Sequence, residues 1–583
     1  MLEFEFLDSE KLESRYFQLE DAEIMIDRGL KGENCGLVYP TGIGKTIVAF
    51  FVMDHYLRSG KKVLFLAHTT ALINQHMESA RSLFKLPDEK INKITGRISE
   101  KKRVKLWGES RIIFATPQTI DNEIKKGTID FDNVGFVVFD EMHMADKKYA
   151  YVALAKLAKE KDIRTIGLTA SSGRAKRIEV LEDNYNIKWW VYRSAEELKK
   201  FVFPKQHLPI IIDYPRLHRH AMKFLRSKIV LIHNELASTG LIDRIEATED
   251  TDRRFPFYRL TELNKLYPPL KRWLDNQKKE KPYFTDPING KRSSWQHFMV
   301  MYIAYYKLMH LLHVFVTEGY EVSLEYVEKI RCELVNKGTP ERPHYRYNAA
   351  FVILFDYNTE RFIKGLHYFI DNEIAHPKIA RILELIEEYK DRNYRMLVFS
   401  NFESTVKALK EYLTKMGYTV ETIAGSKFMK PKEQQAVLAR FKEREFQILL
   451  STTVVEAGID VPKIDVVINY SMPLTGIARI QRGGRAGRTA VGLVYYLIME
   501  NSNDSSLYYA ARSDNVAMVK ELKKRLTIQA LREQGHFYPI RVVQHTLLFA
   551  SGFEEREELT TRQRESKGRR APSKKKIVNP KLL

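Results

Sequence analysis

The chain has 583 residues and carries 95 Lys plus Arg against 74 Asp plus Glu, a formal net charge of +21. Its length is that of about three to five domains, and a hydrophobic content of 44% excludes a disordered or fibrous protein. Two cysteines, Cys35 and Cys332, are too few for a disulfide framework or a zinc ribbon, while the positive surplus indicates a polyanionic partner.

The N-terminal segment, MLEFEFLDSEKLESRYF, is acidic and lacks a basic stretch followed by an apolar one. It therefore does not have the pattern of a secretory signal. We expect the protein to stay inside the cell.

Short apolar runs recur between residues 30 and 200. They are LVY before Pro40, VLFLA (63–67), IIFAT (112–116), FVVFD (136–140) and IGLTA (166–170). Helix-patterned segments separate them, and such unalternated runs predict the strands of a parallel sheet that is covered on both faces. Residues 1–205 are therefore expected to form an α/β domain.

A glycine-rich segment, YPTGIGKT, lies between the first predicted strand and an apolar helix. Gly42 and Gly44 let the backbone turn its N–H groups toward a β-phosphate, Lys45 offsets the charge of the β- and γ-phosphates, and the Thr46 hydroxyl reaches magnesium. A glycine-rich turn alone is a weak signal. Gly-Lys-Thr at the start of a helix is much stronger and predicts an ATP site.

Two adjacent carboxylates end the predicted strand FVVFD and begin the segment DEMH. Asp140 is expected to hold the magnesium ion, directly or through water, and Glu141 to polarise the water that attacks the γ-phosphate. Without a phosphate loop, two solvated acids in a turn would be the preferred interpretation. Both motifs together predict ATP hydrolysis.

From about residue 216 the apolar runs give way to long helical patterns, so residues 206–375 are expected to form a helical insertion. Its most apolar stretch, residues 298–316, carries Lys307, His310 and His313 at spacings that give a helix a polar side. This pattern predicts a buried helix and no membrane span.

One part of the insertion, residues 253–307, is strongly basic. It contains 12 Lys or Arg against four Asp or Glu, interleaved with aromatic residues. Basic groups neutralise phosphates and aromatic faces stack on unpaired bases, but the same aromatic residues could form the core of the insertion, and both interpretations stay open. The expected phosphate contacts are Arg253, Arg254, Lys271 and Arg272.

Apolar runs resume after residue 376, so residues 376–530 are expected to form a second α/β domain. These runs are MLVFS (396–400), ILLST (448–452), VVINY (466–470) and LVYYLI (493–498). In the segment IARIQRGGRAGR (477–488), between the last two of these runs, Arg485 and Arg488 are three residues apart and are expected to share a helix face. They would neutralise transition-state charge on the γ-phosphate, although a basic surface helix is the alternative.

Residues 531–583 form a C-terminal extension. From residue 561 it has nine Lys or Arg against one Glu and almost no large apolar residues. We expect this basic tail to be disordered, and its binding of nucleic acid stays open.

Five segments, in chain order, resemble the motifs of superfamily 2 helicases of the DEAD/DEAH type. They are YPTGIGKT, DEMH, TAS (169–171), STTVVEAGIDVP (451–462) and QRGGRAGR (481–488). Residues 72–99, 115–129 and 137–156 and the helical insertion resemble the helicase part of archaeal Hef and Fanconi anaemia M-type helicases. The resemblance implies two RecA-like lobes that close on ATP. Residues 530–583 contain neither the nuclease centre nor the helix-hairpin-helix repeats of full-length Hef, so no nuclease activity is expected.

The resemblance also implies roles that the patterns alone do not assign. The segment RYFQ is similar to the family's adenine-contacting segment, with Gln18 as the reader of the base and Arg15 beside it. The resemblance implies that Thr41 in the phosphate loop binds the nucleotide and that Gln481, beside the arginines, takes part in catalysis. Gly458 and Asp460 would sense nucleotide and nucleic acid. Three further residues would link hydrolysis to lobe movement: His143, Thr169 and Ser171.

Residues that follow the strands are the expected contacts with a nucleic-acid strand, because ligands bind at the carboxyl ends of strands in such sheets. Thr116 and Pro117 follow one predicted strand, and Thr452 and Thr453 follow another. Their hydroxyls and N–H groups suit phosphate binding, which carries no sequence information. The resemblance adds Thr95, Gly96 and Ser400.

The sequence thus predicts an ATP-dependent, magnesium-requiring DNA helicase or translocase that acts on forked or branched DNA in replication restart or repair. We expect the protein in the cytoplasm, associated with an archaeal nucleoid, or in the nucleus if its source is eukaryotic. A separate nuclease or a replication or repair protein is a candidate partner. Two alternatives stay open. One is an RNA helicase or duplex-RNA-activated ATPase of the Dicer or RIG-I type, and the other is a nucleic-acid-dependent translocase that does not separate strands.

Overall fold

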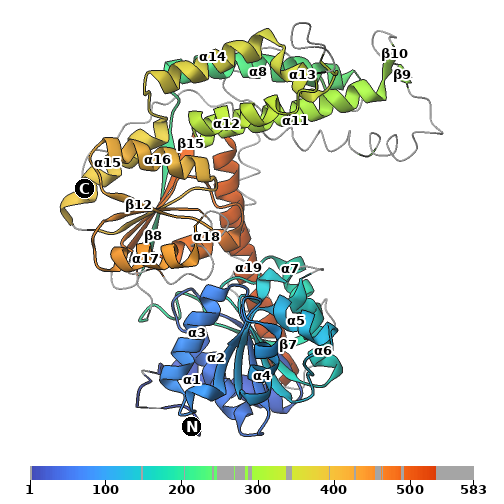
Figure 1. Ribbon diagram of the computed structural model, residues 1–583, viewed down its shortest axis with the longest axis vertical. Coiled ribbons are helices and arrows are strands. Elements are labelled where there is room, and N and C mark those ends of the chain that lie inside the picture. The colour runs from blue at the N-terminus through green and yellow to red at the C-terminus, as the bar shows by residue number, and fades with distance from the viewer. Residues whose placement is uncertain are drawn as a thin grey trace, which may run out of the picture.

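Two α/β lobes and a helical insertion follow one another along the long axis of the computed structural model, with the second lobe in the middle (Figure 1). The structure describes residues 3–8, 10–12, 14–145, 149–201, 204–238, 242–245, 268, 283–285, 292–336, 345–392, 394–425, 429–452, 461, 464–487 and 491–533. The expected basic contacts of the insertion, Arg253, Arg254, Lys271 and Arg272, and the basic tail from residue 561 lie outside the described residues.

The first lobe is built on a seven-stranded parallel sheet with the order β3-β4-β2-β5-β6-β1-β7. Helices α1 to α3 and helices α4 to α7 contribute to two separate hydrophobic clusters, one on each face. Strands β1, β2 and β4 are therefore buried at every position, and the predicted α/β domain is confirmed. The strands are β1 (Asn34–Val38), β2 (Lys62–Leu66), β3 (Ile91–Ile94), β4 (Ile112–Ala115), β5 (Val134–Phe139), β6 (Arg164–Thr169) and β7 (Ile187–Tyr192), and the helices are α1 (Tyr16–Leu30), α2 (Lys45–Leu57), α3 (Thr70–Leu83), α4 (Glu100–Glu109), α5 (Pro117–Lys125), α6 (Ala150–Glu160) and α7 (Ala175–Tyr185).

The second lobe has a six-stranded parallel sheet with the order β12-β13-β11-β14-β15-β8. Two hydrophobic clusters again cover its two faces. Its strands are β11 (Met396–Phe399), β12 (Val420–Ile423), β13 (Ile448–Ser451), β14 (Val466–Asn469) and β15 (Gly492–Met499), and its helices include α15 (Pro377–Tyr389), α16 (Glu403–Lys415), α17 (Pro431–Lys442) and α18 (Gly476–Gly483).

The sixth strand of this sheet, β8 (Lys205–Ile212), comes from the segment that precedes the insertion. It pairs along its whole length with β15, from Lys205 opposite Gly492 to Ile212 opposite Met499. The expected insertion of residues 206–375 therefore begins too early, because Gln206–Ile212 belongs to the second sheet. Its edge position tolerates Pro209 and leaves alternate residues exposed, which hides the strand from a search for unalternated apolar runs.

The insertion is helical, as expected. Its elements are α8 (Arg216–Ala237), α11 (Trp295–Thr317), α12 (Tyr320–Arg331), α13 (Ala349–Leu354), α14 (Tyr357–Asp371) and a short hairpin of β9 (Tyr283–Thr285) and β10 (Arg292–Ser294). Among the described residues, α11 alone is long and apolar enough to cross a membrane. More than half of its apolar window is buried, and it packs against α8 in the hydrophobic core of the insertion, which confirms the prediction of a buried helix.

A 31-residue helix, α19 (Asn503–Glu533), leaves the second lobe and reaches the first (Figure 1). Met518 and Leu522 join a hydrophobic cluster of the first lobe. The Gln529 side chain accepts a hydrogen bond from Trp190 N at 3.0 Å and donates one to Trp190 O at 3.1 Å. This helix therefore covers the β7 edge of the first sheet.

Candidate active site between the two lobes

The phosphate loop lies between β1 and α2, as the sequence predicts. Gly42 and Gly44 have φ angles of 81° and 89°, in the left-handed region that favours glycine. Gly44 also has no room for a side chain, because a Cβ there would lie 2.5 Å from Gln18 Nε2. Lys45 is the first residue of α2, so the loop presents N–H groups at the start of a helix, where phosphate binds well.

The Gln18 side chain holds this loop from α1. Its Nε2 donates to Ile43 O at 2.8 Å, and its Oε1 accepts from Arg15 N at 3.0 Å. Only 3% of Gln18 is exposed. The structure thus gives Gln18 a role in shaping the loop, and its reading of adenine stays a prediction, as does the role of Arg15, whose guanidinium lies over the Phe201 ring.

The paired carboxylates follow β5, and each is held differently. Asp140 is buried, with its Oδ2 2.9 Å from His76 Nε2. Glu141 has a φ of 48°, a conformation that is strained for any residue with a side chain and recurs at functional sites. Burial raises the pKa of Glu141, but the hydrogen bond to His143 and the charge of Lys45 outweigh it and lower the pKa to about 2. Glu141 is therefore ionised at neutral pH.

The residues expected to bind magnesium supply suitable oxygens. Thr46 lies in the first turn of α2, and Asp140 follows β5. In the described part of the chain no three His, Cys, Asp or Glu side chains gather as a metal site. The two oxygens of Thr46 and Asp140 suit magnesium, which is commonly held by one or two protein ligands together with phosphate oxygens and water.

The expected coupling residues form one connected group. His143 Nδ1 lies 3.0 Å from Thr169 Oγ1 and 3.3 Å from Glu141 Oε2, and Thr169 Oγ1 donates to Ser171 O at 2.8 Å. Ser171 Oγ in turn donates to Met518 Sδ of α19 at 3.1 Å. The group therefore extends from Glu141, the carboxylate expected to polarise water, to a helix that starts in the second lobe.

The glycine-rich end of α18 meets the phosphate loop. A Cβ on Gly484 would lie 1.8 Å from Thr41 Oγ1, so these two residues bring the lobes into direct contact. A cavity of about 260 Å³ adjoins this contact and is lined by Tyr39 and Pro40 of the first lobe and by Arg479 of α18.

The prediction that Arg485 lies on a helix face is wrong. Helix α18 ends at Gly483 with Gly484 as its C-cap, since two successive glycines disfavour its continuation, and Arg485 lies in the turn beyond. Gln481 is buried in α18. Arg488, Gly458 and Asp460 lie outside the described residues, so their roles stay predictions.

The expected nucleic-acid contacts lie at the carboxyl ends of strands in both lobes. Thr95 follows β3, Thr116 follows β4 as the residue before Pro117, Ser400 follows β11 and Thr452 follows β13, while Thr453 lies outside the described residues. Since the strands of each sheet are parallel, these ends share one edge.

The side chains at this edge differ in exposure. Thr95 is 3% exposed and Ser400 is 1% exposed, whereas Gly96 is exposed. A Cβ on Gly96 would lie 3.8 Å from Thr119 Oγ1, which is itself 2.7 Å from Thr116 Oγ1. Contacts at Thr95 and Ser400 would therefore involve the backbone around them.

Several residues of the site are missed by sequence reasoning. His76 contacts Asp140, Met518 contacts Ser171, and Thr119 joins Thr116, although each pair except the last is far apart in the sequence. Each of the three lies within a helix. No local pattern marks His76 and Met518, because only tertiary packing brings them to the site, whereas Thr119 lies in the first turn after Thr116 and its spacing could have indicated it.

Two family models match the chain. The DEAD/DEAH box helicase model matches residues 20–178, and the helicase conserved C-terminal domain model matches residues 377–490. The first range lies in the first lobe and the second range in the second lobe.

Similar curated proteins are helicases by name. A putative ATP-dependent RNA helicase of Methanocaldococcus jannaschii is 29% identical over 90% of this chain and 62% of its own length. The ATP-dependent DNA helicase MPH1 of Scheffersomyces stipitis is 23% identical over 90% of this chain and 52% of its own length. The chain thus spans little more than half of the length of these relatives.

A solved structure shares the fold. The crystal structure of the Hef helicase domain of Pyrococcus furiosus is similar with a TM-score of 0.61 and 29% identity, over 87% of this chain and 99% of that chain. The two lobes described above are therefore RecA-like, as expected.

Proposed function

This chain belongs to the DEAD/DEAH-box helicases of superfamily 2, a family of ATP-dependent enzymes, and we propose that it is a DNA helicase or translocase that acts on forked or branched DNA in replication restart or repair. Closure of the two lobes on ATP would move the protein along one strand. The insertion would engage the duplex or the branch.

The main support for this proposal is that the two lobes are in contact at the expected ATP site. The phosphate loop of the first lobe touches Gly484, the residue before Arg485 in the second lobe. A nucleotide held by the loop would therefore contact both lobes, and its hydrolysis would change how they fit together.

Each residue of the site has a distinct part in the proposed hydrolysis. Lys45 would neutralise the phosphates, and Arg485 would offset charge that develops in the transition state. Ionised Glu141 would orient and polarise the attacking water. Thr46 and Asp140 would hold magnesium, which supplies further positive charge beside the phosphates.

DNA is favoured over RNA by the balance of relatives. Relatives of Scheffersomyces stipitis, Neurospora crassa, Pyricularia oryzae and Coccidioides immitis are named ATP-dependent DNA helicases, and that of Schizosaccharomyces pombe a putative one. That of Arabidopsis thaliana is named an ATP-dependent RNA helicase, and that of Methanocaldococcus jannaschii a putative one. The last two names keep an RNA substrate as the second candidate.

The test of this function compares ATP hydrolysis with forked DNA, single-stranded DNA and duplex RNA at one salt concentration, since salt alone changes affinity strongly. We expect forked DNA to give the largest stimulation. Stronger stimulation by duplex RNA would overturn the choice of DNA and favour the second candidate.

Two variants test the site assignment. Lys45→Ala removes a phosphate-binding charge, and Glu141→Gln removes the carboxylate that polarises water, so each is expected to lower DNA-stimulated turnover by at least about 10²-fold. Gly108→Ala is a matched control, because a Cβ on Gly108 has no neighbour within 4 Å. Full activity of either variant would contradict the assignment.

A strand-displacement assay decides between helicase and translocase. We expect the protein to separate forked DNA under the conditions that stimulate its ATP hydrolysis. Stimulated hydrolysis without displacement would favour a translocase that leaves strands paired.

A further inference from the structure

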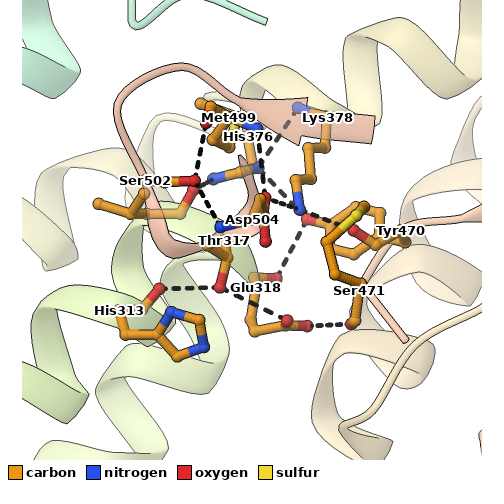
Figure 2. Close-up of polar contacts among 12 residues, drawn as sticks. His313, Thr317, Glu318, His376, Lys378, Tyr470, Ser471, Met499, Ser502 and Asp504 are labelled. Atoms are coloured by element: carbon orange, nitrogen blue, oxygen red, sulfur yellow. Dashed lines mark hydrogen bonds and ion pairs between the residues drawn. The ribbon is translucent and has the colours of Figure 1, made fainter. Parts of the chain in front are cut away.

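The turn between α11 and α12 carries a glutamate of the insertion into the second lobe. Glu318 is the last residue before Gly319, whose φ of 127° only glycine adopts readily. Glu318 is 4% exposed and points toward Ser471 at the end of β14 (Figure 2). The turn thus places one carboxylate of the insertion at the end of the second sheet.

Three hydroxyls of the second lobe surround this carboxylate. Glu318 Oε2 accepts hydrogen bonds from Ser471 at 2.6 Å, from Thr405 at 3.3 Å and from Ser400 at 3.4 Å. They come from the end of β14, from α16 and from the end of β11. Because hydrogen bonds to a charged or buried carboxylate are stronger than ordinary ones, Glu318 draws these three elements together.

The same hydroxyls fix the backbone of the next turn. Ser471 Oγ accepts from Asn401 N at 3.0 Å, and Ser400 Oγ accepts from Phe402 N at 3.1 Å. Ser400 is one of the expected nucleic-acid contacts. The N–H groups of Asn401 and Phe402 are thus held by hydroxyls that themselves bond to Glu318.

A second set of contacts extends from this turn to α18. Arg482 donates to Ser471 O at 2.7 Å and to Asn401 Oδ1 at 2.6 Å. Arg482 lies next to Gln481 in the helix that ends at the phosphate loop of the other lobe. Ser471 and Asn401 therefore link the insertion to the strand-facing turn and to the ATP site.

A buried ion pair fixes the same junction from the other side. Lys378, at the start of α15 where the chain returns from the insertion, lies 2.8 Å from Asp504 Oδ2 and donates to Tyr470 O at 2.6 Å (Figure 2). The Tyr470 hydroxyl donates to Glu318 O at 3.1 Å. Since breaking a buried ion pair is costly, the junction is rigid enough for Glu318 to act on the turn.

We propose that Glu318 is a positioning residue by which the insertion holds the Ser400–Phe402 turn in the form that binds a nucleic-acid strand. The part of this inference that concerns DNA binding rests on the proposed function. The part that concerns the order of the turn rests on the contacts of Glu318 alone.

The first experiment measures amide hydrogen exchange in the full chain without DNA. In Glu318→Ala we expect the amides of Asn401 and Phe402 to exchange about tenfold faster, since they lose hydroxyls held in place by the carboxylate. Glu318→Gln keeps an oxygen acceptor and is expected to restore most of the protection. Unchanged exchange in Glu318→Ala would overturn the inference whatever the substrate.

The second experiment measures how much forked DNA half-saturates ATP hydrolysis. We expect Glu318→Ala to raise this concentration about tenfold while turnover at saturating DNA falls less than about twofold, and Glu318→Gln to lie between it and wild type. Faster exchange with an unchanged half-saturating concentration would overturn the link to DNA binding. A wild-type enzyme that DNA does not stimulate would instead overturn the proposed function, and the exchange result would still decide the role of Glu318.

A matched control separates positioning from simple loss of a contact between the insertion and the lobe. Glu325 on α12 also contacts the second lobe, through Ser404 of α16, but it is exposed and does not reach Ser400 or Ser471. We expect Glu325→Ala to keep wild-type exchange at Asn401 and a wild-type response to DNA. The same change in both variants would show that any weakening of this interface suffices, which contradicts the proposal.

Discussion

At the scale of single residues, the site depends on buried polar side chains whose partners are distant in the sequence. Gln18 bonds to Ile43 in the phosphate loop, His76 contacts Asp140, and Glu318 binds Ser471. A buried polar group that loses its partner costs about 1–3 kcal/mol, so these pairs fix the conformation of the loops that carry them.

Glu318 is expected to make the folded state less stable as the pH rises. Burial raises its pKa to about 7, although the charge of Lys378 and the hydrogen bonds from Ser471 and Thr405 lower the pKa, and the charge of Asp504 adds to the rise. The folded state therefore keeps the Glu318 proton to higher pH than the unfolded state. The contribution to stability is complete below pH 4.5 and is lost as the pH rises through 7, with a slope of at most about 1.4 kcal/mol per pH unit.

Thermal unfolding between pH 5 and 8 checks this sign. Glu318→Gln cannot titrate, so the melting temperature of the wild type is expected to fall relative to that of the variant as the pH rises. His376, which also faces this junction, contributes with the opposite sign, because burial keeps its pKa in the folded state well below the 6.5 of the unfolded state; it is present in both proteins and cancels from their difference. A constant difference between the two proteins across this range would contradict the prediction.

The sequence predicts the contiguous segments of the candidate site better than their surroundings, and the roles of their residues stay predictions. The phosphate loop and the paired carboxylates are contiguous segments, and backbone geometry demands glycine at positions 42 and 44, so local pattern suffices to find them. Arg485 shows the limit, because its spacing from Arg488 predicted a shared helix face and two glycines end the helix before it. His76 and Glu318 have no local signature, since packing alone brings them to their partners.

At the scale of elements, α19 is the feature that most affects how the lobes are joined. It starts in the second lobe and places Met518 and Leu522 in a hydrophobic cluster of the first. Leu522 is fully buried, and Arg525 adds an ion pair with Glu182 of α7 at 2.6 Å. The helix thus fixes the first lobe to the second independently of any nucleotide.

Truncation of Leu522 tests this attachment. Leu522→Ala removes buried apolar volume and is expected to lower the free energy of unfolding by about 2–4 kcal/mol and to speed amide exchange at Trp190 in β7. Val516→Ala on the exposed face of the same helix is the control and is expected to leave both unchanged, since Val516 is 65% exposed. Unaltered exchange at Trp190 in Leu522→Ala would mean that α19 does not hold the edge of the first sheet.

Pattern reasoning finds the central strands and misses those at the edges. Strands β2, β4 and β5 are nearly continuous apolar runs because helices cover both of their faces. At the edges, β3 contains Asn92 and Lys93, and β8 alternates between exposed and partly buried positions. Edge strands need less apolar surface, so their sequences resemble those of loops.

At the scale of the whole molecule, the chain passes between the lobes more than once. After the first lobe it adds β8 to the edge of the second sheet, forms the insertion, completes the second lobe and returns to the first through α19 (Figure 1). The lobes are therefore tied at the β7 edge by α19 and meet at the ATP site through Gly484 and Thr41. Movement of the lobes coupled to hydrolysis would change the contact between Gly484 and Thr41, while α19 keeps the lobes together.

The contact between Gly484 and Thr41 gives a test of that arrangement. Gly484→Ala adds a Cβ that would lie 1.8 Å from Thr41 Oγ1, so the lobes must separate at the ATP site to accommodate it. ATP binding to the phosphate loop belongs to the first lobe and is expected to change little. Hydrolysis needs both lobes, and its rate is expected to fall by at least about 10²-fold, as it does when arginines from a second domain are withdrawn from an NTP site.

Nucleotide binding and single-turnover hydrolysis, measured on the same preparation, separate these two effects. The Gly108→Ala variant supplies the control for a methyl group added where space is free. Loss of binding and hydrolysis together would indicate that Gly484 shapes the phosphate loop itself. Binding that survives while hydrolysis is lost would support a required contact between the lobes. The added Cβ would also lie 2.9 Å from Ile480 O of α18, so unchanged amide exchange in α18 is needed to assign the loss to the contact with Thr41.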